Sequence, residues 1–344
     1  MDGEQPAAEQ RTPMWSPEIA LRSKKQVLLE DYKVPDSQAA SLVSHKRQEG
    51  PFTANPTTFK PHDVTIFYQA RSSPPIPSYE EIVKASAKNP LHADNGLHKE
   101  AESLLFLAEN RPKLPIPTLL AAWSSKNEYG NVINFFMMNF IEGITLVDHR
   151  EFAELSAHAQ DAICAKVSSQ IRYLRELPSE GYYGRPHGQG WFYPPPGLDT
   201  HTSASFTLVG PYKTYEEFCS AMYRSHQVSE AISTSDPEWH PAHQKDSAEI
   251  RSLLSSWEPH EPKFTWIDPA LKNMIVRPIK GTDGSEDWEV FFIDWECAAW
   301  YPAWVQALQL DSRGEIVPMM LKDFDPEPDQ KKMDRLHYLF WRFF

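Results

Sequence analysis

Two aspartates and one asparagine flank a predicted β-hairpin towards the C-terminal end of the chain: Asp268, Asn273 and Asp294. Residues 273–277 and 288–293 have the β-branched and aromatic content of strands, and an Asp-Gly pair between them is a strong turn signal. Antiparallel pairing of these two segments would bring their outer ends together. The sequence therefore predicts that two carboxylates and one amide converge at one end of the hairpin.

Such a group of oxygen donors suits a hard cation, because Mg²⁺ prefers carboxylate, amide and phosphate oxygens to nitrogen and sulfur ligands. Phosphoryl transfer uses this set of groups. One carboxylate orients a hydroxyl and accepts its proton, while the other groups hold the metal against the phosphates of a nucleotide. Polar residues also cap hairpins without any catalytic role, and the spacing alone leaves both interpretations open.

The overall composition argues against several other functions. The chain has 34 Lys and Arg against 47 Asp and Glu, a formal net charge of −13 and no Lys/Arg-rich run, so we expect no nucleic-acid partner. Three widely spaced cysteines form no CxxC pair, which favours a reducing, cytoplasmic location. The longest apolar run, near 132–141, is about half as long as a bilayer span, so we expect no membrane partner.

The first part of the chain predicts an extension followed by a small unit of strands and one helix. Residues 1–60 mix charges and prolines with few apolar patterns, and we expect a loosely docked, partly disordered extension. Segments 64–69 and 80–85 are strand-like, and apolar residues at helical spacing over 101–108 predict a helix. Residues 132–139 are typical of a buried strand. The predicted order is strand, strand, helix, strand.

The remainder of the chain predicts a mainly helical unit. An apolar periodicity over 155–174 marks a long amphipathic helix, and Thr214 with Glu217 forms a capping box at the start of a second helix. Residues 226–260 are polar, and we expect a loop there with a short helix near its end. The His-Pro-Ala-His sequence in this loop lacks a third metal ligand nearby, so we interpret its histidines as solvated.

Residues 264–302 resemble the aminoglycoside phosphotransferase and choline kinase-like family. The family's HxDxxxxN loop is similar to residues 266–273, its metal-binding IDWE segment to 293–296, and the turn that follows to 299–302. Weaker similarities upstream extend the resemblance over roughly residues 80–310. Several landmarks in the same order are more specific than any one of them.

This resemblance implies an α+β, bilobal protein kinase-like fold with a small β-sheet-plus-helix N-lobe and a larger, mainly helical C-lobe. The expected boundaries are an N-terminal extension over 1–60, an N-lobe over 61–143 that ends in a hinge, and a C-lobe over 144–344. The implied activity is transfer of the γ-phosphate of ATP to a hydroxyl of an unidentified small molecule. Fold likeness alone does not name that acceptor.

The resemblance also implies roles for individual residues. Asp268 would be the catalytic base, and Asn273 and Asp294 would hold Mg²⁺. A strand lysine and a helix glutamate would pair to hold the nucleotide phosphates, with Glu102 as a rival for the glutamate, and main-chain groups of the hinge would meet the adenine. The residues expected at the nucleotide are Lys84, Glu100, Met138, Asn139 and Ile141.

Three departures from the family pattern leave a second interpretation open. Trp266 stands where the family has histidine, and because an indole donates but does not accept a hydrogen bond, the internal support of the loop must differ. Pro269 directly follows Asp268 and restricts its backbone. No glycine-rich turn precedes Lys84 to bind phosphate. The alternative is a catalytically impaired pseudokinase that acts as a nucleotide-binding or interaction protein.

Overall fold

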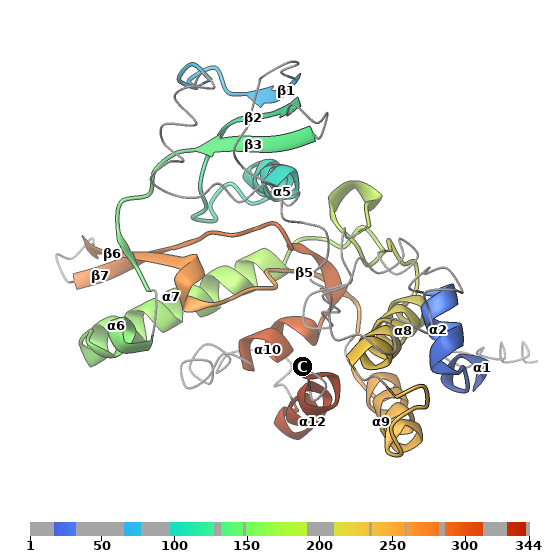
Figure 1. Cartoon of the computed structure of the whole chain (residues 1–344). Helices are drawn as coiled ribbons and strands as arrows, with labels where there is room; N and C mark the ends of the chain where they lie inside the picture. The colour runs from blue at the N-terminus through green and yellow to red at the C-terminus, as the bar shows by residue number, and fades with distance from the viewer. Residues whose placement is uncertain are drawn as a thin grey trace, which may run out of the picture.

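The computed structural model combines three small antiparallel sheets with a larger set of helices (Figure 1). A three-stranded sheet and one helix form the upper part in this view, a hairpin lies on a long helix in the middle, and further helices lie below and to the right. The α+β class expected from the sequence is confirmed. The structure describes residues 17–31, 65–76, 97–126, 132–146, 149–190, 210–233, 236–258, 260–281, 286–311 and 329–341.

The upper sheet has the antiparallel strand order β1 (Thr65–Gln69), β2 (Leu119–Lys126) and β3 (Val132–Met138). Helix α5 (Leu97–Asn110) packs beneath it and buries Leu107 completely. Because β2 lies in the centre, β1 occupies the edge that faces away from β3. Within the described part of the chain, the other edge of β3 has no partner strand.

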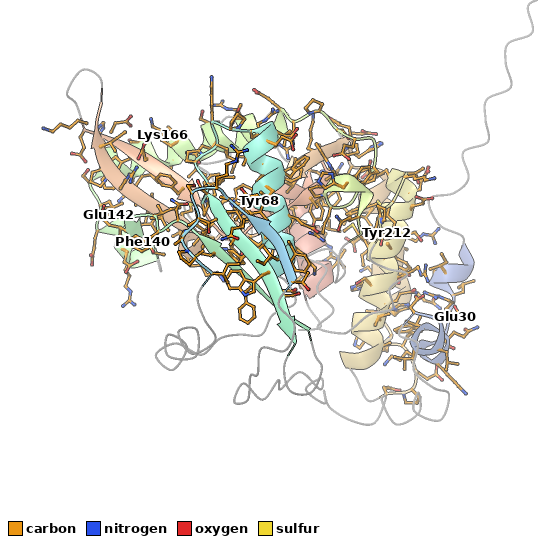
Figure 2. All side chains as sticks on the ribbon, turned by 90° about the horizontal axis from the view of Figure 1, so that it is seen from above. Glu30, Tyr68, Phe140, Glu142, Lys166 and Tyr212 are labelled. Atoms are coloured by element: carbon orange, nitrogen blue, oxygen red, sulfur yellow. The ribbon has the colours of Figure 1, made fainter. Side chains whose placement is uncertain are left out.

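The segment after β3 connects this sheet to the lower part of the molecule. Phe140 is 89% exposed, whereas Ile141, the next residue, is buried. Seen from above, Phe140 and Glu142 lie at one end of the molecule and Glu30 lies at the other (Figure 2). The N-terminal helices are therefore docked away from this linker.

The predicted hairpin is present and lies on a long helix. Strands β6 (Met274–Lys280) and β7 (Glu286–Phe292) pair in register, and the short β4 (Ile144–Thr145) extends the sheet on the β6 side. Helix α7 (Ala157–Arg175), which the periodicity predicted, packs against β7 and turns Ile163, Val167 and Ile171 among its buried residues towards the interior.

A second predicted feature, the capping box, begins helix α8. The Glu217 amide donates to Thr214 Oγ1 at 3.1 Å, and the Thr214 amide donates to Glu217 Oε2 at 3.3 Å, which confirms the prediction. The remaining elements are α6 (His149–Ala153), η1 (Pro186–Gly188), α8 (Tyr215–Ser233), α9 (His243–Ser255), β5 (Pro262–Thr265), η3 (Leu271–Asn273), β8 (Ala299–Pro302), α10 (Val305–Asp311) and α12 (Gln330–Trp341).

Part of the N-terminal extension is firmly docked. Helices α1 (Pro17–Ala20) and α2 (Lys24–Glu30) pack beside α8, and Val27 is fully buried there. The carboxylate of Asp31 is also fully buried, and it accepts hydrogen bonds from Arg22 and Arg224. We expected a loose attachment for this region, and the docking of residues 17–31 corrects that expectation.

Three other expectations were wrong in whole or in part. Residues 119–126, for which we predicted no strand, form the central strand of the upper sheet. The polar stretch predicted as a loop is largely helical, because α8 continues to residue 233 and α9 begins at His243. His243 is buried rather than solvated, and its Nδ1 lies 2.6 Å from a buried Glu230 oxygen. The strand predicted over 80–85 lies outside the described residues.

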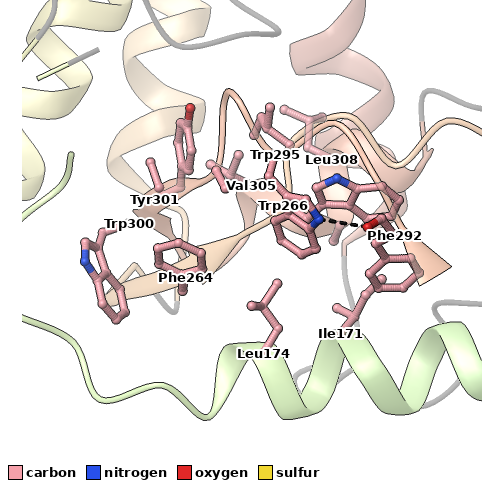
Figure 3. Close-up of a cluster of buried hydrophobic side chains, with 14 of the residues drawn as sticks. Ile171, Leu174, Phe264, Trp266, Phe292, Trp295, Trp300, Tyr301, Val305 and Leu308 are labelled. Carbon is pink, nitrogen blue, oxygen red and sulfur yellow. Dashed lines mark hydrogen bonds between the residues drawn. The ribbon is translucent and has the colours of Figure 1, made fainter. Parts of the chain in front are cut away.

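A cluster of aromatic side chains fills the interior between the hairpin and α7 (Figure 3). Trp266 and Trp295 are fully buried there beside Phe292, above Ile171 and Leu174 of the helix. The Trp295 indole Nε1 donates to the Phe292 carbonyl at 2.9 Å. This core supports the end of the hairpin where the predicted site lies. In the part of the chain that the structure describes, no helix has both the length and the apolar character needed to cross a membrane.

Candidate active site

The side chain of Asn273 joins the two aspartates of the predicted site. Its Nδ2 donates to Asp268 Oδ2 and to the Asp268 carbonyl oxygen, both at 3.0 Å, and to Asp294 Oδ2 at 3.2 Å. The Oδ2 atoms of Asp268 and Asp294 therefore both lie within hydrogen-bond distance of the same nitrogen. Asn273 is buried, whereas the Asp268 side chain is 28% exposed. The structure thus brings the three side chains together and leaves the carboxylate of Asp268 partly accessible.

A tight turn and the hairpin hold Asn273 in this position. The turn η3 closes when the Asn273 amide donates to the Ala270 carbonyl at 2.9 Å. The Ile293 amide then donates to the Asn273 carbonyl at 3.0 Å, which continues the ladder between β6 and β7. Asp294, directly after this bond, has a φ of 64°, in the left-handed region that non-glycine residues seldom adopt. Neighbouring contacts must hold it there.

Trp266 supplies one of those contacts. Its indole Nε1 donates to the Asp294 carbonyl at 3.2 Å, and its ring stacks on Phe292 with centroids 4.2 Å apart. The fully buried Gln306 fixes the Trp266 main chain from both sides: the Trp266 amide donates to Gln306 Oε1 at 3.0 Å, and Gln306 Nε2 donates to the Trp266 carbonyl at 2.8 Å. The indole of Trp266 is therefore a hydrogen-bond donor that supports the main chain of Asp294.

Glu100 of α5 reaches the same segment from the other side. Its Oε1 accepts a hydrogen bond from the Trp295 amide at 3.4 Å. Burial, reinforced by the nearby negative charge of Asp294, raises the pKa of the Glu100 carboxyl to about 7. Glu102, the rival candidate, instead binds Arg185 at 2.6 Å. Of the two glutamates, Glu100 is the one that faces the segment after β7.

The other residues predicted at the nucleotide lie along the linker that follows β3. Met138 is the last residue of β3 and is 37% exposed, and Ile141 is buried. The Asn139 amide donates to the Thr118 carbonyl at 3.1 Å, and its Oδ1 accepts from the Thr118 amide at 2.5 Å. This pair of bonds ties the linker to the start of β2. Lys84 lies outside the described residues.

Two charged contacts near the site were not predicted. The Lys272 Nζ lies 3.8 Å from Asp268 Oδ2, and its side chain is 60% exposed. The spacing of four residues between them could have suggested this pair. The pair of Arg185 with Glu102 joins residues 83 positions apart, and no local pattern indicates it.

The donor set at the site is compatible with Mg²⁺. Among the described residues, no three His, Cys, Asp or Glu side chains meet in a way that could hold a metal by themselves. Mg²⁺ typically takes only one or two carboxylates and completes its shell with water and substrate phosphates. A carboxylate and an amide side by side, as at Asp294 and Asn273, match this coordination by Mg²⁺ better than that of zinc, which is bound mainly by histidine and cysteine.

The fold and the site together define a class of protein. A small sheet with one helix, a linker, and a helical part with a carboxylate-bearing hairpin form the bilobal protein kinase-like arrangement expected from the sequence. The model of the "Phosphotransferase enzyme family" matches residues 82–306, more than half of the chain. The chain belongs to this family.

Further comparisons add two solved structures. The chain is similar to APH(2")-IIia, solved in complex with GDP and kanamycin, with 15% identity, 72% of each chain covered and a TM-score of 0.42. It is also similar to the aminoglycoside phosphotransferase APH(2'')-Ib in its ADP-bound form, with 13% identity, 81% of this chain and 82% of that chain covered and a TM-score of 0.41. A comparison with curated proteins gave no match.

Proposed function

We propose that this protein transfers the γ-phosphate of ATP to a hydroxyl of a small molecule. The observation that carries the proposal is the Asn273 amide, which lies within hydrogen-bond distance of two carboxylates at once. Membership of a phosphotransferase family supports the reaction class. The three cysteines are unpaired, in keeping with a cytoplasmic location.

Asp268 is the proposed catalytic base. Its Oδ2 is held by Asn273 and its side chain is partly exposed, so it can orient an acceptor hydroxyl and take up the proton as the phosphoryl group is transferred. Asn273 and Asp294 are the proposed magnesium ligands. When bound, Mg²⁺ would offset the negative charge that develops on the phosphates.

The proposed nucleotide site uses the small sheet, α5 and the linker. Main-chain groups of Asn139 and Ile141 would meet the adenine, and Met138 would border it. Lys84 and Glu100 would form the pair that holds the phosphates. The buried position of Glu100 beside the Asp294 segment supports its part in this arrangement.

Thermal unfolding with and without nucleotide tests the proposal. We expect ATP with Mg²⁺ to raise the midpoint of unfolding, since a ligand at a hundred times its Kd stabilises by about 2.7 kcal/mol. Neither component alone should suffice, and Asp294→Ala should abolish the effect. A panel of hydroxyl-bearing metabolites, assayed for ADP release with Asp268→Asn as the blank, then identifies the acceptor. A wild-type protein that ignores magnesium nucleotide would refute the proposal.

One observation favours the pseudokinase alternative. Strand β1 pairs with the edge of β2 that faces away from β3, so it does not extend the sheet beside the linker where the adenine would bind. The thermal experiment and the ADP-release assay together separate the two functions. An impaired protein would show nucleotide binding without ADP release in the presence of any acceptor, or no response to nucleotide at all.

A further inference from the structure

Arg185 is a buried arginine that joins the loop after α7 to helix α5. It is only 4% exposed. Its Nη2 donates to Glu102 Oε2 at 2.6 Å and, at a longer 3.5 Å, to the Lys99 carbonyl, so one nitrogen bonds two α5 residues that are three positions apart. Its Nη1 contacts Gln189 Oε1 at 3.4 Å. The bond of 2.6 Å to Glu102 is charge-assisted, and bonds of this kind are among the stronger polar contacts in proteins.

The loop that carries Arg185 is itself rigidly held. The Arg185 amide donates to the Gln189 carbonyl at 2.8 Å, and the Tyr182 hydroxyl donates to the Arg185 carbonyl at 2.8 Å. A side chain at Gly184 would place its Cβ 2.6 Å from the Gln189 carbonyl oxygen, so the loop requires glycine there. Arg185 is therefore attached to a fixed base rather than to a mobile segment.

The loop that carries Arg185 is anchored to β8, the strand that follows residues 293–296 around Asp294. The Gly184 amide donates to the Trp300 carbonyl at 3.0 Å, and the Trp300 amide donates back to the Gly184 carbonyl at 2.8 Å. Trp300 is fully buried in the aromatic core. The position of Arg185 is thus fixed relative to the part of the chain that contains the candidate site.

Helix α5 is consequently tied to the Asp294 segment at two points. Glu100 bonds directly to the Trp295 amide, and Glu102, two residues further along the helix, is held through Arg185. The direct bond is long, at 3.4 Å, whereas the bond from Arg185 is short. His187 adds an edge-on contact with Phe106 of α5, with ring centroids 5.8 Å apart. The shorter, charge-assisted contact is therefore the one that Glu102 makes with Arg185.

We propose that Arg185 is a positioning residue, which through Glu102 sets the place of α5 and so keeps the Glu100 carboxylate against the segment that carries Asp294. Its consequence for phosphoryl transfer rests on the proposed function. Loss of the pair would let α5 move away from the hairpin, and Trp295 would lose its acceptor. The orientation of Asp294, which already has a strained backbone, would then be less well defined.

Glu102→Gln is the variant of choice to test this role. The Glu102 side chain is 41% exposed, so the substitution removes one charge without opening the core, whereas truncation of Arg185 could prevent folding. Glu249→Gln is the matched control. Glu249 binds Arg335 through two bonds of 2.5 and 2.6 Å and is 30% exposed, but this pair joins α9 to α12, away from α5. Glu102→Asp serves as the conservative variant.

Amide hydrogen exchange of the free protein is the first measurement. We expect Glu102→Gln to raise exchange at the Trp295 amide and along α5 by about tenfold, the effect of about 1.4 kcal/mol on a local opening equilibrium. Glu249→Gln should leave both regions as in the wild type, and Glu102→Asp should restore part of the protection. Wild-type exchange at Trp295 in Glu102→Gln would overturn the proposal.

The magnesium nucleotide concentration that gives half-maximal stabilisation is the second measurement. It should rise in Glu102→Gln and stay unchanged in Glu249→Gln, and an equal response of the two variants would contradict the role of Arg185. If the wild-type protein shows no nucleotide response, the proposed function fails, while the exchange experiment still decides whether Arg185 positions α5.

Discussion

Replacement of Trp266 by phenylalanine would remove the indole donor that supports Asp294. The Asp294 carbonyl would lose its bond of 3.2 Å to the indole of Trp266, which is itself fully buried. A buried polar group left without a partner costs about 1–3 kcal/mol. The smaller ring also leaves a void beside Phe292, and such losses in a core add about 1–3 kcal/mol.

A neighbouring tryptophan separates the free-energy cost of the void from that of the lost hydrogen bond to Asp294. Trp295 is equally buried, and its indole donates at 2.9 Å to the Phe292 carbonyl rather than to that of Asp294. Trp295→Phe therefore loses the same chemical group, but the carbonyl it leaves unpaired belongs to the hairpin. Both variants should lose a similar free energy of unfolding, measured with urea.

Only Trp266→Phe should weaken the response to magnesium nucleotide. If about 1.4 kcal/mol of the lost bond was used to hold Asp294 in its left-handed conformation, the half-saturating concentration of Mg²⁺ at fixed ATP should rise about tenfold. Trp266→His, which keeps a shorter ring donor, should recover part of this loss. Equal magnesium dependence in Trp266→Phe and Trp295→Phe would refute the reasoning, since the bond to Asp294 would then contribute nothing specific.

Three further predictions follow from charged groups. Folding raises the pKa of the Glu100 carboxyl from 4.5 to about 7, so between these pH values the folded state binds a proton that the unfolded chain releases, and stability falls as the pH rises through this window. In urea unfolding without Mg²⁺, Glu100→Gln should therefore recover up to about 3 kcal/mol of stability at pH 8 but little at pH 4. Lys272→Met should slow ADP release up to about fivefold in an initial-rate assay, because Lys272 is close to Asp268, and it should leave stability unchanged, because Lys272 is exposed. The control Lys263→Met, which removes a lysine 3.5 Å from Glu261, should change neither the rate of ADP release nor the stability. Asp31→Asn should cost about 3 kcal/mol in urea unfolding, because it leaves the paired arginines without their buried carboxylate; an unchanged midpoint would show that the N-terminal helices are not needed for stability.

Local patterns predicted much of the fold and part of the site. The hairpin follows from two strand-like segments around a turn, and the start of α8 follows from Thr214 and Glu217, because each feature depends on residues close in the sequence. The convergence of Asp268, Asn273 and Asp294 is a consequence of the hairpin, and their catalytic roles stay predictions. The domain boundaries drawn at residues 60 and 143 likewise remain predictions.

The features that the sequence did not indicate are those that depend on distant segments. Helix α2 is docked through a carboxylate whose arginine partner, Arg224, is 193 positions away. The burial of His243 depends on Glu230 in another helix, and a polar sequence therefore looked like a solvated loop. Residues 119–126 carry little β-branched content, and they form a central strand because strands on both sides pair with them. None of these partners can be read from spacing along the chain.

The two departures from the family pattern in the loop around Asp268 are compatible with the hydrogen bonds that close this loop. Pro269 brings no amide hydrogen, but the turn is closed by the bonds of Asn273 to the Ala270 and Asp268 carbonyls, and neither bond needs a donor at position 269. Trp266 cannot accept a hydrogen bond, but the contact it makes with Asp294 requires only a donor. The arguments for an impaired enzyme therefore move from this loop to the nucleotide side, where β1 lies on the far edge of the sheet. A measured affinity for magnesium nucleotide together with acceptor-dependent ADP release, rather than further substitutions in the loop, distinguishes a phosphotransferase from a pseudokinase in this chain.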